Sequence, residues 1–151
     1  MKLDRDLREL LELFRYHGVE FLIVGGHAVA FHGHPRLTED LDLFVRPNAI
    51  NGARIVEALK AFGFGSLEIT ADDFRADDRV IQLGRTPNRV DLLTRLYGVD
   101  FDSAWSRRVE ATFDDIPVAM ISRNDLIANK RATGRTQDIA DAEFLEQLAG
   151  S

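Results

Sequence analysis

Two aspartates separated by one residue stand in an apolar segment, and this spacing suits metal chemistry. Asp40 and Asp42 belong to the run DLDLFV at residues 40–45. Alternate side chains of a β-strand share a face, so both carboxylates and Phe44 would point the same way, with about 6–7 Å between the two aspartates. Ionised carboxylates this close repel, and Mg²⁺ or Mn²⁺ relieves the repulsion. The pattern predicts a divalent-metal site; a strand with a solvated acidic face is the alternative.

A glycine pair precedes this segment. Gly25 and Gly26 follow the strand-like residues 20–24 and open a short helix-like segment. Glycine at such a junction lets backbone N–H groups approach a phosphate, and a helix N-terminus favours an anion. A simple turn would also explain the glycines. The order of strand, glycine pair, helix and aspartate pair nevertheless predicts a triphosphate-binding turn beside a metal site.

A third carboxylate stands in a predicted hairpin. Residues 79–83 and 89–94 have the composition of strands, and Asp91 lies between Val90 and Leu92 in the second strand. If this hairpin pairs beside the strand of Asp42, Asp91 joins the acidic face. It would then be a further metal ligand or a general base for an attacking hydroxyl. An exposed or salt-bridged aspartate is the alternative.

These motifs resemble the minimal nucleotidyltransferase superfamily, which has the fold of DNA polymerase β. Within it, the Arg36-x-Thr38-x-Asp40-x-Asp42 run is similar to that of AbiEii-like bacterial nucleotidyltransferases, several of which are toxin components. Residues 122–144, SRNDLIANKRATGRTQDIADAEF, also resemble a segment of these relatives. The resemblance implies an α+β nucleotidyltransferase fold, with a mixed β-sheet flanked by helices and followed by C-terminal helices.

The resemblance also implies roles for individual residues. The metal-binding and catalytic residues would be Asp40, Asp42 and Asp91, and the nucleotide-binding residues would be Gly25, Gly26, Arg36, Thr38 and Lys130. Arg36 and Thr38 could hold a phosphate or only stabilise the turn after Pro35. Lys130 could reach the triphosphate or be a surface lysine of its helix.

The implied reaction is metal-dependent transfer of a nucleoside monophosphate from a nucleoside triphosphate, such as ATP, to a hydroxyl acceptor. The acceptor would be an RNA 3′ end such as that of tRNA, a protein side chain or a small molecule. A cognate toxin or antitoxin protein is a further expected partner. Two alternatives belong to other classes: a non-catalytic nucleotide- or partner-binding module of a toxin–antitoxin pair, and a structural domain without a ligand.

Composition limits the class of protein. The 151 residues, 45% of them hydrophobic, predict one domain over residues 1–151. The absence of cysteine excludes disulfides and thiolate nucleophiles. A net charge of −6 argues against capture of nucleic acid by the whole surface. The N-terminus is charged and amphipathic, and no apolar run approaches the roughly 18 residues of a membrane span, so we expect a cytoplasmic protein without a membrane partner.

Hydrophobic spacing predicts the elements around these motifs. The first helix would bury Leu7, Leu10, Leu11 and Phe14, and the last helix would bury Ile139, Ala142, Phe144, Leu145 and Leu148. Other helices are expected over residues 50–62, 101–107 and from Ser122 to Gly134, with a hairpin of residues 109–113 and 116–121. His27, His32 and His34 do not share one helical face, which disfavours a histidine metal site.

Overall fold

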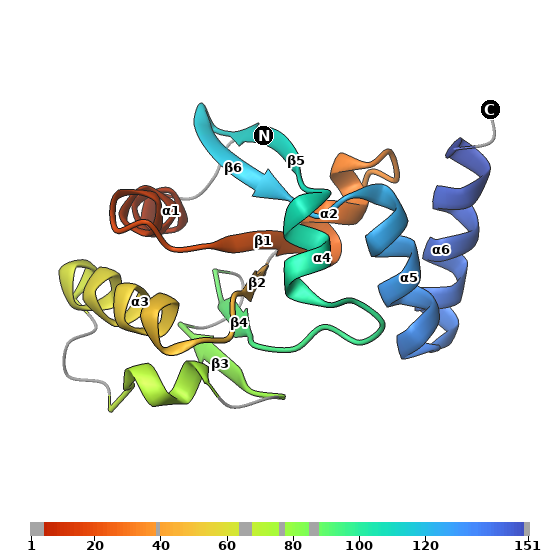
Figure 1. The fold of residues 1–151 in the computed structure, drawn as a ribbon. Helices are drawn as coiled ribbons and strands as arrows, with labels where there is room; N and C mark the ends of the chain where they lie inside the picture. The colour runs from red at the N-terminus through yellow and green to blue at the C-terminus, as the bar shows by residue number, and fades with distance from the viewer. Residues whose placement is uncertain (1–4, 39, 64–67, 76–77, 85–87, 150–151) are drawn as a thin grey trace.

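A six-stranded mixed sheet forms the centre of the computed structural model (Figure 1), with the strand order β3-β4-β2-β1-β6-β5. The structure describes residues 5–38, 40–63, 68–75, 78–84 and 88–149. The strands are β1 (Phe21–Val24), β2 (Leu41–Val45), β3 (Val80–Leu83), β4 (Val90–Leu93), β5 (Val109–Phe113) and β6 (Ile116–Met120). β1 is antiparallel to β2 and parallel to β6, while β2 is parallel to β4. The predicted α+β class with a mixed sheet is confirmed.

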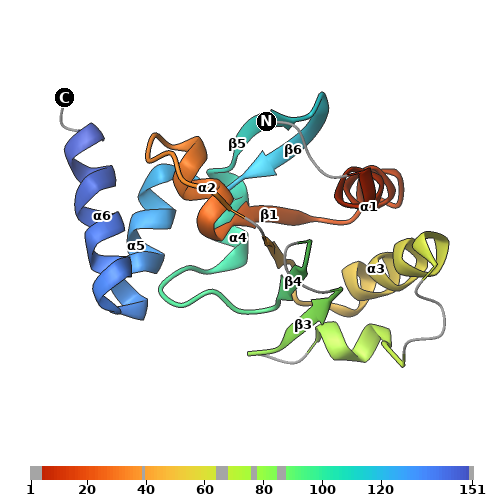
Figure 2. The same cartoon turned by 180° about the vertical axis from the view of Figure 1, so that it is seen from behind.

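Helices lie at both sides of this sheet. They are α1 (Arg5–Tyr16), α2 (Gly25–Phe31), α3 (Ala49–Phe62), the 3₁₀ helix η1 (Ala71–Phe74), α4 (Phe101–Ser106), α5 (Arg123–Thr133) and α6 (Thr136–Ala149). Figures 1 and 2 show α1 and α3 on one side and α5 and α6 on the other. β1 runs from the side of α1 toward α2, so the turn between β1 and α2 faces the side of α5.

Local sequence explains where these helices begin and end. The side chain of Asn48 accepts a hydrogen bond from the backbone N–H of Asn51 at the start of α3, and Ser122 accepts one from Asp125 at the start of α5. Gly63 and Gly134 end the same two helices in the left-handed conformation, with φ values of 105° and 71°. The predicted ends of both helices are therefore confirmed.

The core lies between the sheet and the apolar faces of its helices. All four residues of β1 are buried, as are the predicted α1 residues Leu7, Leu10, Leu11 and Phe14. Phe44, which the strand pattern places on the face of Asp40 and Asp42, is also a core residue. It is 2% exposed, and its ring packs edge-on against Phe101 of α4, 5.0 Å away between centroids. The helix that follows β4 covers this end of β2, which an alternating pattern cannot show.

The buried face of α6 also differs from the predicted one. Ala142 and Leu145 are buried as expected, but the other buried positions are Asp138 and Asp141. The expected core residues Ile139, Phe144 and Leu148 are only partly buried. The spacing i, i+3, i+4 and i+7 is that of a single helical face, so α6 turns two carboxylates inward.

In the described residues, no helix is both long enough and apolar enough to cross a membrane.

The contact between α3 and η1 yields a test of the packing. Gly52 is buried in α3, and a Cβ placed on it would lie 2.6 Å from the backbone oxygen of Ala71. We expect Gly52→Ala to lower the free energy of unfolding by about 1–3 kcal/mol, because backbone must move to admit the methyl group. Urea denaturation followed by circular dichroism would measure it.

Ala53→Gly at the exposed neighbouring position is the matched control. It should cost only about 1 kcal/mol of helix propensity. If propensity alone governed Gly52, the alanine variant would instead be more stable than the wild type, and the proposed close contact would be wrong.

Candidate active site

Strand register brings the predicted acidic residues together. β2 and β4 are parallel neighbours in which Asp42 pairs with Asp91, so both side chains leave the sheet at the same level. Asp40 lies just before the first residue of β2, and its Oδ1 accepts a hydrogen bond of 3.3 Å from the backbone N–H of Arg89. The hairpin thus pairs beside the strand of Asp42, and three carboxylates meet at one end of two adjacent strands.

Burial makes this arrangement electrostatically costly. Asp91 is 8% exposed, and Asp42 is half-buried. Burial, and after it the negative charges of Asp91 and Asp40, raise the pKa of Asp42 from 3.8 to about 6, while Arg89 opposes the change. A hydrogen bond with the Asp91 side chain also favours the protonated form of Asp42. The repulsion that a bound cation would relieve is therefore present in this structure.

Arg89 already neutralises part of this charge. Its guanidinium donates to both carboxylate oxygens of Asp91, at 2.9 and 3.2 Å, and lies 3.5 Å from Oδ2 of Asp40. Arg89 is not among the predicted site residues. The available signal is its position two residues before Asp91, since residues i and i+2 share a strand face.

The donor set suits a hard divalent cation, because all three side chains offer carboxylate oxygens. As the side chains stand, the described residues contain no group of three His, Cys, Asp or Glu side chains arranged to hold one metal ion. The contacts of Arg89 give a physical reason, since its guanidinium occupies two of the three carboxylates. Binding of Mg²⁺ or Mn²⁺ would require these ion pairs to loosen.

The glycine pair is required by the side chains packed against it. Gly25 has a φ of 69°, and a Cβ placed on it would lie 2.1 Å from Oδ2 of Asp42. A Cβ on Gly26 would lie 2.3 Å from Cγ2 of Thr38. Two consecutive glycines therefore admit Asp42 on one side and Thr38 on the other, at the turn from β1 into α2.

The remaining predicted residues gather around a buried acid. Arg36 forms an ion pair with Asp141, and the Lys130 amine lies 3.4 Å from the other oxygen of the same carboxylate. The Thr38 hydroxyl is buried and has no hydrogen-bond partner among the residues that the structure describes. Both cations are thus part of an ion-pair cluster, and the interpretation of Lys130 as a simple surface lysine is wrong, because its side chain is only 12% exposed.

Sequence comparison identifies the family. Residues 1–146 match the family described as "Nucleotidyltransferase of unknown function (DUF6036)". The chain belongs to this nucleotidyltransferase family. The predicted enzyme class and superfamily are therefore confirmed, while the resemblance to the AbiEii-like branch stays a prediction. Among proteins with curated functions, none matches the sequence.

Solved structures of similar fold agree with this assignment. A provisionally named nucleotidyltransferase from Thermotoga maritima has a TM-score of 0.56 at 15% identity, over 97% of this chain and 91% of its own. The lincosamide antibiotic adenylyltransferase LnuA, with lincomycin bound, has a TM-score of 0.56 at 14% identity, over 96% and 97%. An antigenic nucleotidyltransferase-like protein from Paracoccidioides brasiliensis has a TM-score of 0.55 at 16% identity, over 98% and 79%. At these identities the likeness shows the fold alone.

The three neighbouring histidines of the nucleotidyltransferase have separate surroundings. His27 is buried against the ring of Phe113, and burial lowers its pKa. His32 makes a 2.7 Å hydrogen bond with the carbonyl of Ile121. His34 lies against Phe144, with 4.1 Å between ring centroids.

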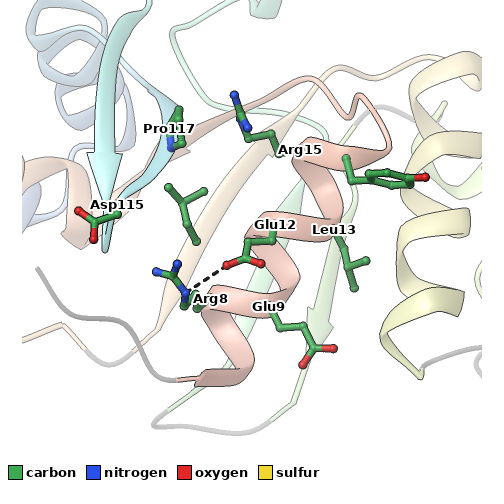
Figure 3. A pocket seen from close by; sticks show the side chains of 9 residues that line it. Arg8, Glu9, Glu12, Leu13, Arg15, Asp115 and Pro117 are labelled. Carbon is green, nitrogen blue, oxygen red and sulfur yellow. Dashed lines mark ion pairs between the residues drawn. The ribbon is translucent and has the colours of Figure 1, made fainter.

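A surface groove of about 820 Å³ lies away from the acidic residues. Figure 3 shows that side chains of α1 and of the β5–β6 hairpin line it, including Arg8, Glu9, Glu12, Leu13, Arg15, Asp115 and Pro117. Its charged side chains are partly paired, with 3.1 Å between Arg8 and Glu12. Asp40, Asp42 and Asp91 do not line this groove, so its size does not make it the active site of the nucleotidyltransferase.

The raised pKa of Asp42 predicts how stability changes with pH. Without metal, the folded protein holds the Asp42 proton up to a pH of about 6 and the unfolded chain only up to about 3.8. Ionisation across this window lowers the free energy of unfolding. We expect Asp42→Asn to remove the pH dependence and to raise the free energy of unfolding at pH 8 by about 1–3 kcal/mol. Urea denaturation in EDTA at several pH values would measure it.

Asp115→Asn in the turn of the β5–β6 hairpin is the control, since Asp115 is exposed and outside the acidic cluster. It should leave the pH dependence unchanged. An Asp42→Asn protein less stable than the wild type at pH 8 would contradict the assigned repulsion.

Proposed function

We propose that this nucleotidyltransferase transfers a nucleoside monophosphate from a nucleoside triphosphate to a hydroxyl acceptor in a metal-dependent reaction. The observation that carries the proposal is the in-register pairing of Asp42 with Asp91, beside Asp40 and against Gly25. Three carboxylates at the end of two strands, with the glycine turn of β1 and α2 next to them, suit metal and phosphate together.

The acidic residues would have different roles in the reaction. Asp40 and Asp42 would hold Mg²⁺ or Mn²⁺, which when bound would stabilise charge on the α-phosphate and on the leaving pyrophosphate. Asp91 would complete the metal site or take the proton of the acceptor hydroxyl. The hydroxyl oxygen forms a bond to the α-phosphorus as the bond to the β-phosphate oxygen breaks, releasing pyrophosphate and one proton.

The residues around the glycine pair would bind the triphosphate. The backbone N–H groups of Gly25 and Gly26, at the turn from β1 into α2, would approach the phosphates. Arg36 would donate two hydrogen bonds, and Lys130 would act as a point charge. Thr38 would contribute its hydroxyl, which the protein itself leaves without a partner among the described residues.

The acceptor would belong to one of three classes. LnuA is named as an adenylyltransferase of lincosamide antibiotics, and its fold spans most of this chain, which supports a small-molecule acceptor. RNA 3′ ends such as those of tRNA, and protein side chains, are the other classes that the sequence resemblance supports. A toxin or antitoxin partner protein would be the acceptor in the protein case.

Turnover tests the proposal. Wild-type protein should release pyrophosphate from at least one α-³²P-labelled nucleoside triphosphate in the presence of Mg²⁺ or Mn²⁺ and a mixture of RNA, protein and small-molecule acceptors. We expect Asp42→Asn and Asp91→Asn each to lower the rate by about a hundredfold or more, because each removes a group required in the transition state. Label transferred to an acceptor would be followed by gel electrophoresis and thin-layer chromatography.

Asp115→Asn again serves as a control, and EDTA should abolish transfer. Metal-dependent nucleotide binding without transfer to any acceptor would favour the non-catalytic binding module. Transfer that persists at the wild-type rate in both aspartate variants would overturn the assigned site.

The ion pairs of Arg89 predict a second effect. Because Arg89 competes for the carboxylates of Asp40 and Asp91, we expect Arg89→Gln to bind Mn²⁺ about tenfold more tightly at low ionic strength. Isothermal calorimetry with MnCl₂ would measure the affinity. Arg75→Gln, which removes an exposed partner of Asp72, is the control. Weaker binding in Arg89→Gln would show that the guanidinium supports the metal-bound form.

A further inference from the structure

The most enclosed charged group in the described residues is the carboxylate of Asp141 in α6, whose side chain has no exposed surface. Its Oδ1 accepts hydrogen bonds from the Arg36 guanidinium and, at 3.0 Å, from the side-chain amide of Gln137. Its Oδ2 lies 3.4 Å from the amine of Lys130. An acid is buried this completely only when its partners compensate for the lost hydration.

The partners come from three separate segments. Arg36 belongs to the stretch between α2 and β2, Lys130 to α5, and Gln137 to the first turn of α6. Burial alone would raise the pKa of Asp141, but the hydrogen bonds from Arg36 and Gln137, together with the charges of Arg36 and Lys130, hold it below its ordinary value. The carboxylate is therefore ionised and fixes both cations.

This cluster adjoins the acidic residues through the glycine pair. A Cβ on Gly26 would lie 3.9 Å from Cδ of Arg36, and a Cβ on Gly25 would lie 2.1 Å from Oδ2 of Asp42. Consecutive residues thus contact the cation held by Asp141 and one of the predicted metal ligands. Figure 1 shows α2, which begins with these glycines, between β1 and α5.

The cluster also carries excess positive charge. Asp138 pairs with Arg135 at 2.7 Å and with Lys130 at 3.3 Å. Two buried carboxylates therefore pair with three cations, the partly buried Arg36 and Lys130 and the largely exposed Arg135. A local excess of cations in a chain of net charge −6 suits a polyanionic ligand.

We propose that Asp141 is a positioning residue that holds Arg36 and Lys130 in place to bind the triphosphate of the substrate. This inference rests on the proposed function. Asp141 itself would touch neither metal nor nucleotide. It would act by restraining two long side chains whose free rotation would otherwise oppose binding.

Calorimetric titration with Mg²⁺-tripolyphosphate, a probe that needs no knowledge of the base, tests the inference. We expect Asp141→Asn to weaken binding of this probe about tenfold or more while Mn²⁺ alone binds as in the wild type. The matched control is Asp125→Asn, which neutralises another buried acid of the same helix pair, held by Arg107 at 2.7 and 3.0 Å. The control should bind the probe as the wild type does, even if it is less stable.

Coupling separates positioning from a purely structural role. If Asp141 acts through Arg36 and Lys130, adding Asp141→Asn to an Arg36→Gln/Lys130→Gln protein should cause no further loss of affinity. If Asp141→Asn does not fold, Gln137→Ala can replace it, because Gln137 is exposed and its loss removes only one hydrogen bond of the carboxylate. We expect this variant to bind the probe about threefold more weakly than the wild type.

If Asp141→Asn binds the probe with wild-type affinity, the inference is overturned and the proposed function still stands. The same holds for Gln137→Ala if it is the only variant that folds. A full additional loss in the triple variant also overturns it. Failure of the wild type to bind either Mg²⁺-tripolyphosphate or any Mg²⁺-nucleoside triphosphate overturns the proposed function and this inference with it.

Discussion

Three like charges held close together are the constraint around which this molecule is arranged. The parallel pairing of β2 with β4 places Asp42 beside Asp91, and Asp40 follows because it immediately precedes β2. Each neighbouring feature makes that proximity tolerable. Arg89 supplies a counter-charge, and the absence of a side chain at Gly25 gives the Asp42 carboxylate space against the backbone. The raised pKa of Asp42 shows that part of the electrostatic cost remains.

Positively charged side chains lie next to the acidic residues. Arg36 and Lys130 form ion pairs with the buried Asp141, so two cations that would ordinarily reach into solvent are held between α5, α6 and the segment after α2. The glycine pair lies against both groups, with Asp42 next to Gly25 and Arg36 next to Gly26. An acidic half and a cationic half on the two sides of one turn match the needs of a metal–triphosphate complex, which carries charges of both signs.

Local patterns predicted much of this fold because they depend on a few neighbouring residues. The apolar stripe of α1, the glycines that end α3 and α5, and the alternating strands all have causes within one or two turns of chain. The burial of Phe44 was not predictable from its strand, because α4, more than fifty residues later, covers it. The acids Asp40, Asp42 and Asp91 were identifiable, but their proximity depends on a strand register that only the folded sheet determines.

The positions of Asp138, Asp141 and Arg89 were not predicted, and the physical cause is the same for all three. Hydropathy treats Asp138 and Asp141 as solvent-facing, whereas ion pairs from distant segments allow them to be buried. Arg89 has the sequence context of an ordinary strand cation, and only the fold brings it to Asp40 and Asp91. In both cases the information lies in pairs of charges that are far apart in sequence, and single-residue properties do not contain it.

The spread of these residues along the chain has a consequence for biosynthesis. The turn at Gly25 leaves the ribosome early, and the acids follow by Asp91, but the anchor of the cationic half comes only with α6. When the last strand, β6, has been synthesised, the chain contains the three acids and Arg36, whereas Lys130 in α5 and Asp141 in α6 are still to come. The cationic half of the site is assembled last, after every strand of the sheet has been synthesised.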